Sequence, residues 1–359
     1  MKCVKCGEDS KKKDRADGTC PKCGTRFALD PTAGDVVTDM AVHAAIERVS
    51  AGGHVRFLAD HVALDLLRRA KPGSGVVRMV GFGIVATVVL LVGALLAVGG
   101  PIEMTVLALA PLVVAFALIG IGGASPAPTP DALAAAVSKY LQVHGKPKGL
   151  IDLSKPRLPP SKAVLAELEG YSFDRAVICD TRENAEILLA NDFHFENNCA
   201  VLTIDGYPAG VFEVVRKMIR ANPKIEVFAL HDCTPEGLRV QPRLTEEEAW
   251  FKGRRVVDVA LNPSQAEAFR EAWLPTPRIV GSGPWSSSDA AWLREWTLRL
   301  AAIPPDQLIK RLFRAMQQGG ADSETAMTAG GDGGGGDVIV PVPFTAPASS
   351  SDGGGDNFG

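Results

Sequence analysis

Short apolar runs and longer amphipathic stretches alternate through the C-terminal half of the chain. The amphipathic stretches have the spacing of helices, whereas the apolar runs have the length of buried strands. Strands that alternate with helices predict a parallel sheet, and right-handed crossovers bring the carboxyl ends of its strands to one edge. We therefore expect a Rossmann-like α/β domain over residues 161–316, with strands at 175–179, 200–204, 225–231 and 255–263.

Two uninterrupted apolar runs occupy the middle of the chain. No charged residue lies between Arg78 and Glu103, and none lies between Glu103 and Asp131. Each run is about the length that an α-helix needs to cross the hydrocarbon core of a bilayer. The fold class expected from this pattern is a multi-domain membrane protein, and a buried helix pair in a large core is the alternative. The predicted transmembrane hairpin covers residues 77–123, with spans at 79–98 and 104–122.

The charges beside these runs predict an orientation. Four basic residues precede the first run, whereas the link between the runs has only an acidic residue. The positive-inside rule then puts both termini in the cytoplasm, because a hairpin returns the chain to its starting side. We expect a protein of the inner (cytoplasmic) membrane, with the membrane as a partner and no charge within a span to conduct ions. The basic residues are Arg68, Arg69, Lys71 and Arg78.

Four of the seven cysteines lie near the N-terminus, in two Cys-x-x-Cys pairs that are each followed by a glycine. Each pair suits a tight turn that points two sulfurs at one ion, and four thiolates form a tetrahedral zinc site. We expect a zinc ribbon over residues 1–30 that depends on its metal, because so short a segment has little core. The segment resembles the zinc ribbons at the front of many bacterial membrane proteins; two redox-active dithiols are the alternative. The predicted zinc ligands are Cys3, Cys6, Cys20 and Cys23.

The remaining segments differ in composition. Residues 35–71 have helical spacing interrupted by a Ser-Ala-Gly-Gly turn, and residues 124–160 form a proline-rich linker around one helical stretch. Residues 317–359 are rich in glycine, aspartate and serine, so we expect a disordered tail. The first fifteen residues lack the apolar segment of a secretory signal, and the scattered cysteines indicate a reducing compartment.

An aspartate follows each of the first three predicted strands: Asp180, Asp205 and Asp232. Ligands bind at the carboxyl ends of parallel strands, and three carboxylates there could hold Mg²⁺, which prefers oxygen ligands. The three aspartates are candidate catalytic residues, and Asp180 and Asp232 are candidate Mg²⁺ ligands. The alternative is that each aspartate caps a helix or turn, since Asp180 and Glu183 have capping-box spacing and Asp205 precedes a turn.

Two stretches of this domain, VLTIDGYPAGVFEVVRKM and VFALHDCTPEGLRV, resemble the Toprim domain of topoisomerase VI A subunits and of the related meiotic double-strand-break protein. That family has a Gly-Tyr-Pro-type turn after one strand, which residues 206–208 match. It has an Asp-x-Asp-Pro-x-Gly motif after a later strand, which Asp232, Pro235 and Gly237 match. The resemblance covers about residues 175–240 and implies a Toprim-like fold with a Mg²⁺ site at the second motif.

The chain departs from the family at two positions. Thr234 stands where the motif has its second aspartate, and Asp180 stands where Toprim domains have a glutamate after the first strand. The first change removes a negative charge from the cation site. The second keeps a carboxylate but places it on a shorter side chain. Neither Tyr140 nor Tyr171 lies in a motif like that of the family's DNA-cleaving tyrosine. The resemblance thus implies the fold and a weakened metal site rather than DNA cleavage.

Other features of the sequence limit the cofactors and partners that we expect. No Gly-x-Gly-x-x-Gly or P-loop pattern is present, so we expect no dinucleotide cofactor. The net charge of −3 gives no global attraction to nucleic acid, so any such attraction must be local. His231 is expected to pack on the face opposite Asp232. Basic residues expected near the strand-end edge are Arg182, Arg239, Arg243, Arg254 and Arg255.

Three functions are consistent with this organisation. The first is a module with little or no catalysis that binds or recruits a nucleic acid, a nucleotide or a protein partner. The second is a Mg²⁺-dependent phosphoryl-transfer or nuclease-like enzyme that uses the three aspartates. The third is a purely structural scaffold. We favour the first, with Zn²⁺ as cofactor and Mg²⁺ as a further candidate.

Overall fold

The computed structural model describes residues 1–15, 17–70, 128–155, 173–277 and 281–328. The chain divides into two compact units. The first comprises residues 1–68 and 130–359, and it contains nearly all of the described residues. The second, residues 69–129, lies almost wholly outside them.

The predicted membrane architecture has to be corrected. In the part of the chain that the structure describes, no helix combines the length and the apolarity needed to cross a bilayer. The two predicted spans, 79–98 and 104–122, lie outside the described residues. The prediction depended on uncharged length alone, and a helix that is apolar on all sides also occurs in a protein core. The membrane-protein fold class, the membrane partner and the inner-membrane localisation therefore have no support in the structure.

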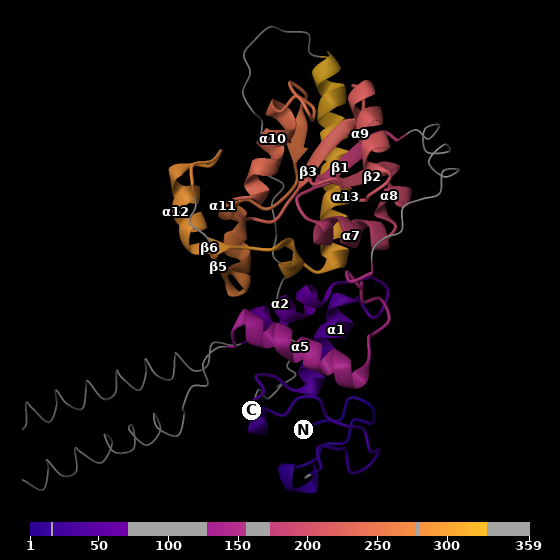
Figure 1. The fold of residues 1–359 in the computed structure, drawn as a ribbon, viewed down its shortest axis with the longest axis vertical. Coiled ribbons are helices and arrows are strands. Elements are labelled where there is room, and N and C mark those ends of the chain that lie inside the picture. The colour runs from indigo at the N-terminus through magenta and orange to yellow at the C-terminus, as the bar shows by residue number, and fades with distance from the viewer. Residues whose placement is uncertain (16, 71–127, 156–172, 278–280, 329–359) are drawn as a thin grey trace, which may run out of the picture. The chain divides into compact units, whose positions relative to one another are not determined.

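A four-stranded parallel sheet lies at the centre of the C-terminal domain (Figure 1), which confirms the predicted α/β class. The sheet has the order β2-β1-β3-β4, and every neighbouring pair is parallel. The chain runs outward from β1 to β2 and then returns past β1 to β3. The order therefore reverses between β1 and β3, the position at which open α/β sheets bind ligands. The strands are β1 (Arg175–Cys179), β2 (Cys199–Thr203), β3 (Glu226–Leu230) and β4 (Val256–Asp258).

Helices cover both faces of the sheet because alternate strand residues point to opposite sides. Val177 and Phe228 belong to one core cluster with residues of α7 (Arg182–Ala190) and α13 (Pro305–Thr328). Their chain neighbours Ile178 and Val227 belong to another, with residues of α9 and α10. The domain therefore has three layers. The helices of the second face are α9 (Phe212–Ala221) and α10 (Val240–Glu246).

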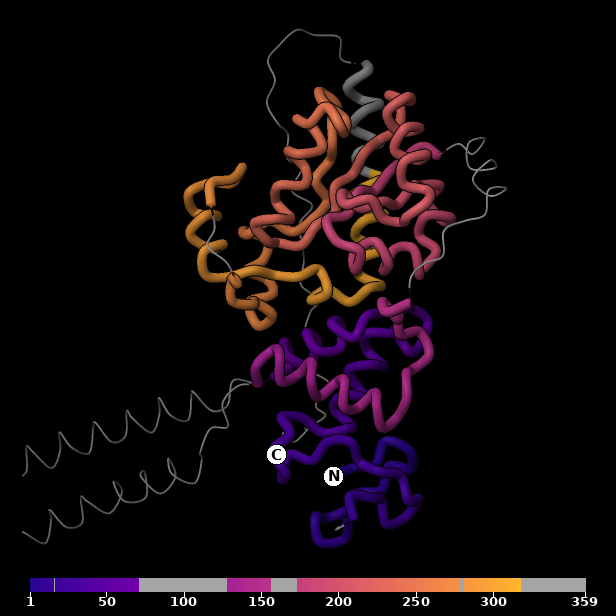
Figure 2. Tube along the Cα trace, in the orientation of Figure 1, coloured from indigo at the N-terminus to yellow at the C-terminus, as the bar shows by residue number. Residues whose placement is uncertain are grey.

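A helical bundle follows the N-terminal ribbon. It consists of α1 (Asp39–Val49), α2 (Ala59–Arg69) and α5 (Pro130–His144). Figure 2 shows the magenta segment of α5 beside the indigo and violet segments of α1 and α2, although residues 71–127 separate them in the sequence. The side chains that form their shared core are Val42, Ile46, Val62, Leu66, Leu133 and Val137.

Shorter elements complete the C-terminal domain, and the last helix is longer than expected. α13 continues to Thr328, whereas the disordered tail was expected to begin at residue 317; residues 329–359 lie outside the described residues. Glutamine, glutamate, alanine and methionine in this stretch are good helix formers, and they extend a helix that is already packed. The shorter elements are α8 (Phe193–Glu196), α11 (Pro263–Ala266), β5 (Leu274–Pro275), α12 (Ser287–Glu295) and β6 (Trp296–Thr297).

Candidate functional sites

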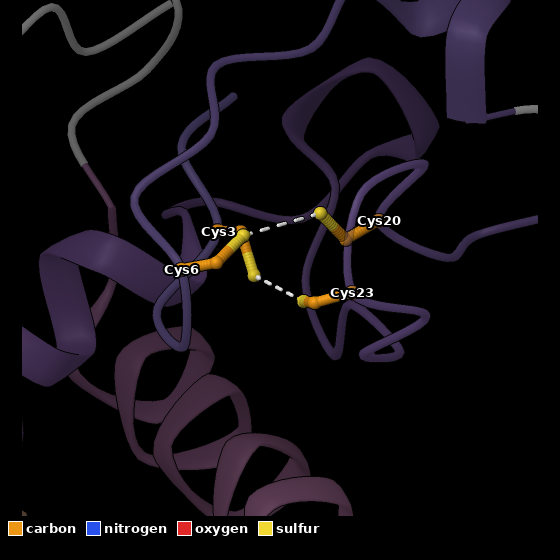
Figure 3. Close-up of side chains that lie close together, drawn as sticks. All are labelled: Cys3, Cys6, Cys20 and Cys23. Carbon is orange, nitrogen blue, oxygen red and sulfur yellow. Dashed lines mark hydrogen bonds between the residues drawn. The ribbon is translucent and has the colours of Figure 1, made fainter.

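The four N-terminal cysteines face one another from two similar turns (Figure 3). Their sulfur atoms all lie within 4.8 Å of one another. The Sγ atoms of Cys3 and Cys23 are 3.6 Å apart, as are those of Cys6 and Cys20. A tetrahedral ion with bonds of about 2.3 Å holds its sulfur ligands about 3.8 Å apart. The cluster thus has the dimensions of a four-coordinate metal centre, and no second group of this kind is found among the described residues.

Both turns are built in the same way. The Gly7 N–H donates to the Cys3 carbonyl, and the Gly24 N–H donates to the Cys20 carbonyl, each at 2.9 Å. The two glycines have φ angles of 71° and 68°, which L side chains rarely adopt. The glycine after each Cys-x-x-Cys pair is therefore required by the turn, as the sequence predicted.

The surroundings of the cluster act unequally on its thiols. Cys3 and Cys20 are buried, and the Thr25 hydroxyl lies 3.1 Å from the Cys23 sulfur. The backbone hydrogen bond at Glu8 lowers the pKa of Cys6, but burial and hydrogen bonds with the other cysteines outweigh it and raise that pKa. The hydrogen bond from Thr25 lowers the pKa of the Cys23 thiol. A lower pKa favours the thiolate, which is the form that binds a metal.

Asp39 fastens the ribbon to the helical bundle. Its buried carboxylate accepts the N–H groups of Ala28 and Leu29 at 2.9 and 2.8 Å, and His144 Nε2 of α5 lies 2.7 Å away. The Leu29 side chain is fully buried in the core of the bundle. The end of the ribbon and the bundle are therefore held by one polar network and one apolar core.

Asp180 and Asp232 meet at the carboxyl ends of the two central strands. Asn184, in the first turn of α7, donates to Oδ1 of Asp180 at 2.8 Å and to Oδ1 of Asp232 at 3.1 Å. The Asp232 N–H donates to Oδ2 of Asp180 at 2.8 Å, and the Leu300 N–H donates to Oδ1 of Asp232 at 2.9 Å. Two of the three aspartates predicted to lie together thus share one hydrogen-bond network at the switch point.

The surroundings of Asp232 weaken its acidity. Burial, followed by the negative charge of Asp180, raises the pKa of Asp232 to about 6. A carboxyl pair of this kind can hold a proton near neutral pH. The arrangement suits either a proton-transfer site or a buried structural pair.

Asp205 lies apart from this network. It is exposed in the turn that follows β2, which is an edge strand. No group of three carboxylates that could hold an ion is found in the described part of the chain. The capping alternative for Asp180 is also wrong, because Thr181 is the N-cap of α7 and accepts the Asn184 N–H.

The turn after Asp232 is closely packed. The Thr234 hydroxyl accepts the Gly237 N–H at 3.0 Å. A Cβ on Gly237 would lie 2.2 Å from the Asp232 carbonyl oxygen, so only glycine fits. Thr234 therefore caps this turn.

The Gly-Tyr-Pro turn is tied to α7. The Tyr207 hydroxyl donates to the Glu186 carboxylate, and the Arg182 guanidinium lies 5.1 Å from the centre of the Tyr207 ring. Arg182 also donates to the Lys155 carbonyl at 3.0 Å. These contacts give the turn a structural role. They also hold the Arg182 side chain against the Tyr207 ring and the Lys155 carbonyl.

His231 forms an ion pair that the sequence analysis missed. The side chain is fully buried, as expected, but its Nε2 lies 3.2 Å from Oδ2 of Asp258 at the end of β4. Burial opposes a charge on the imidazole, but attraction to Asp258 outweighs it and raises the pKa of His231 to about 9. The available signal was the acid inside the fourth apolar run, because an acid at a strand end can pair with a histidine of the neighbouring strand.

The arginines near the strand ends are fewer than expected. Arg239 donates to the carbonyls of Pro235 and Ser282. Arg243 pairs with Glu247 at 3.0 Å. Arg254 and Arg255 precede β4 and therefore lie at the amino end of the sheet, so the carboxyl edge has few cations to offer a phosphate.

No family model, curated protein or solved structure matches this chain. The Toprim resemblance therefore stays a prediction, and function has to be inferred from the two sites.

Proposed function

We propose that this protein is a zinc-binding protein whose α/β domain is a Toprim-like binding module without catalytic activity. The module would recruit a nucleic acid, a nucleotide or a protein partner. The ribbon would hold Zn²⁺ through Cys3, Cys6, Cys20 and Cys23, because four thiolates at tetrahedral spacing suit zinc. The ion would supply folding energy rather than chemistry, since all four positions are filled by protein.

One observation supports the absence of catalysis above all others: the chain's own donors engage the strand-end carboxylates. Both oxygens of Asp180 accept hydrogen bonds, and Oδ1 of Asp232 accepts two. Mg²⁺ requires near-octahedral oxygen coordination and is usually bound by one or two free carboxylates with several waters. Oδ2 of Asp232 is the remaining acceptor, and the Thr234 hydroxyl is used by Gly237.

Titration of the full-length protein with Mg²⁺ and Mn²⁺, followed by calorimetry, tests this proposal. We expect no heat of binding from the wild type at millimolar metal, and the same result from Asp232→Asn. Saturable binding by the wild type that Asp232→Asn abolishes would show a cation site and overturn the proposal.

The zinc assignment has its own test. Elemental analysis of the purified protein should find one zinc ion per chain, and Cys3→Ser with Cys20→Ser should abolish it. The control is Cys199→Ser, which changes a buried cysteine outside the cluster. Iron in place of zinc, or full zinc content in the double variant, would contradict the assignment.

The second candidate is a Mg²⁺-dependent phosphoryl-transfer or nuclease-like enzyme. The favouring observation is that Asp180 and Asp232 lie together at the point where the strand order reverses. This function requires Asn184 and Leu300 to release the carboxylates when metal binds. Phosphodiester cleavage that depends on Mn²⁺ and is lost in Asp180→Asn would favour it.

A further inference from the structure

Exposed cations gather at the C-terminal end of α9. Lys217 and Arg220 are three residues apart on this helix, so they lie on the same face. Lys224 follows just after the helix ends, before β3 begins. All three side chains are exposed. They line the amino-end edge of the sheet, opposite the strand-end carboxylates.

Arg254 brings a second segment to the same place. Its guanidinium donates to the carbonyls of Ile219, Asn222 and Ile225, which form the end of α9 and the approach to β3. These bonds satisfy the last carbonyls of the helix and hold the segment before β4 against it. We call Lys217, Arg220 and Lys224 the basic face.

Two nearby acidic groups are paired: Glu226 lies 3.4 Å from Arg175, and Glu213 lies 2.8 Å from Arg216. A third, Asp174, is exposed and accepts a hydrogen bond from the Asn198 amide. In the part of the chain that the structure describes, none of the three cations of the basic face forms an ion pair. A local positive surface therefore exists on a chain whose net charge is −3.

We propose that the basic face binds the phosphate backbone of a nucleic acid. Clustered lysine and arginine side chains displace the counterions around phosphates, and this displacement drives binding without regard to sequence. Protein interfaces instead depend on exposed aromatic anchors. The aromatic residues beneath this face, Trp250 and Phe251, are 4% and 3% exposed, so they are not available to a protein partner.

The proposal deepens the proposed binding role by naming one partner, but it uses none of the strand-end carboxylates. Asp232→Asn is therefore expected to bind nucleic acid as the wild type does. Saturable Mg²⁺ binding would overturn the proposed absence of catalysis and leave this inference untouched.

The test measures binding of the full-length protein to labelled duplexes of DNA and of RNA by fluorescence anisotropy at several salt concentrations. The variant combines Lys217→Gln, Arg220→Gln and Lys224→Gln. We expect it to bind at least about tenfold more weakly at low salt, and the slope of log K against log salt to fall by about one for each lost phosphate contact. The matched control removes three exposed cations elsewhere, through Arg270→Gln, Arg294→Gln and Lys310→Gln.

Three outcomes would overturn the proposal. The first is that neither duplex binds the wild type at low salt. The second is that the variant and the control lose affinity equally while circular dichroism shows both to be folded. The third is that a poly-glutamate peptide binds as tightly as the duplexes at the same salt, which would assign the basic face to an acidic protein.

Discussion

The fold changes the pKa of the Asp232 carboxyl group. It lies between a second carboxylate and two donors, and it is partly removed from water at the end of a central strand. The raised pKa determines whether the stability of the fold rises or falls with pH. The pKa is raised to about 6 in the folded chain, whereas an unfolded aspartate has a pKa of about 3.9. The folded state therefore holds the proton more tightly, and stability falls as pH rises through this window.

Asp232→Asn should remove this dependence. The free energy of unfolding of the variant minus that of the wild type should rise by about 2 to 3 kcal/mol between pH 4 and pH 7, because the wild type alone must ionise a disfavoured carboxyl group. Urea denaturation across this pH range measures the difference. Asp205→Asn, at an exposed turn, is the control and should change stability little at any pH. Parallel pH profiles for wild type and Asp232→Asn would contradict the account.

The His231–Asp258 pair has a consequence of the same sign at higher pH. A histidine with a raised pKa stabilises the fold fully below its unfolded pKa of about 6.5, and this stabilisation is lost as pH rises through about 9. In Asp258→Asn, burial is opposed only by the hydrogen bond to the Asp232 carbonyl and by the charge of Asp180, so the pKa of His231 should fall well below about 9.

NMR titration of the imidazole measures that pKa, and urea denaturation at pH 7 should show a loss of about 1 to 2 kcal/mol, because solvent screens the partly exposed Asp258 carboxylate. The control is Asp306→Asn, which breaks a 3.5 Å pair on the surface of α13 and should cost less than about 1 kcal/mol. An unchanged His231 pKa in Asp258→Asn would rule out the ion pair as its cause.

At the scale of elements, the turn from β3 into α10 holds the site in place. Cys233 exchanges two backbone hydrogen bonds with Leu298, which places the Leu300 N–H against Asp232. Gly237 lets the chain pass close to the Asp232 carbonyl. A change in this turn therefore disturbs both the turn and the carboxylate network.

Gly237→Ala should destabilise the domain by about 2 kcal/mol or more, since its Cβ would lie 2.2 Å from a backbone oxygen that cannot easily move. Thermal unfolding measures the effect. Gly281→Ala is the matched control, because no atom lies within 4 Å of its added Cβ and its φ is not in the left-handed region. Equal unfolding temperatures for the two variants would show that the turn can yield.

The sequence predicted the first three strands to within one residue at each end, because buried runs such as 175–179 are unambiguous in an alternating pattern. The fourth strand was predicted too long, since β4 ends at Asp258 and α11 begins at Pro263. It also predicted the meeting of Asp180 and Asp232, which follows from parallel strand direction. It could not predict that Asn184 bridges them, since that contact depends on the position of α7 over the sheet. The hairpin prediction failed for a related reason, because uncharged length does not specify what surrounds a helix.

At the scale of the molecule, the metal centre and the helical bundle depend on each other. The bundle includes α5, which follows residues 71–127 in sequence, so distant parts of the chain meet at Asp39 and His144. Leu29 joins the apolar core of the bundle directly after the second cysteine turn. Loss of the ion should therefore spread beyond the ribbon into the bundle. Leu58 and Leu64 join the core on one face of the sheet, whereas the core on the other face contains no residue of the bundle.

Removal of the metal by a strong chelator should increase hydrogen exchange at the amides of Ala28 and Leu29, which donate to Asp39. Amides of β1 and β3 should keep their protection, because they lie in the interior of the sheet. Exchange measured by mass spectrometry, with metal content determined on the same samples, resolves the two regions. In a variant with Cys3→Ser and Cys20→Ser, these two amides should exchange quickly from the start, and the chelator should add nothing. If Ala28 and Leu29 stay protected in fully metal-free protein, Asp39 and Leu29 hold the end of the ribbon without the ion, and the proposed coupling between metal and bundle is wrong.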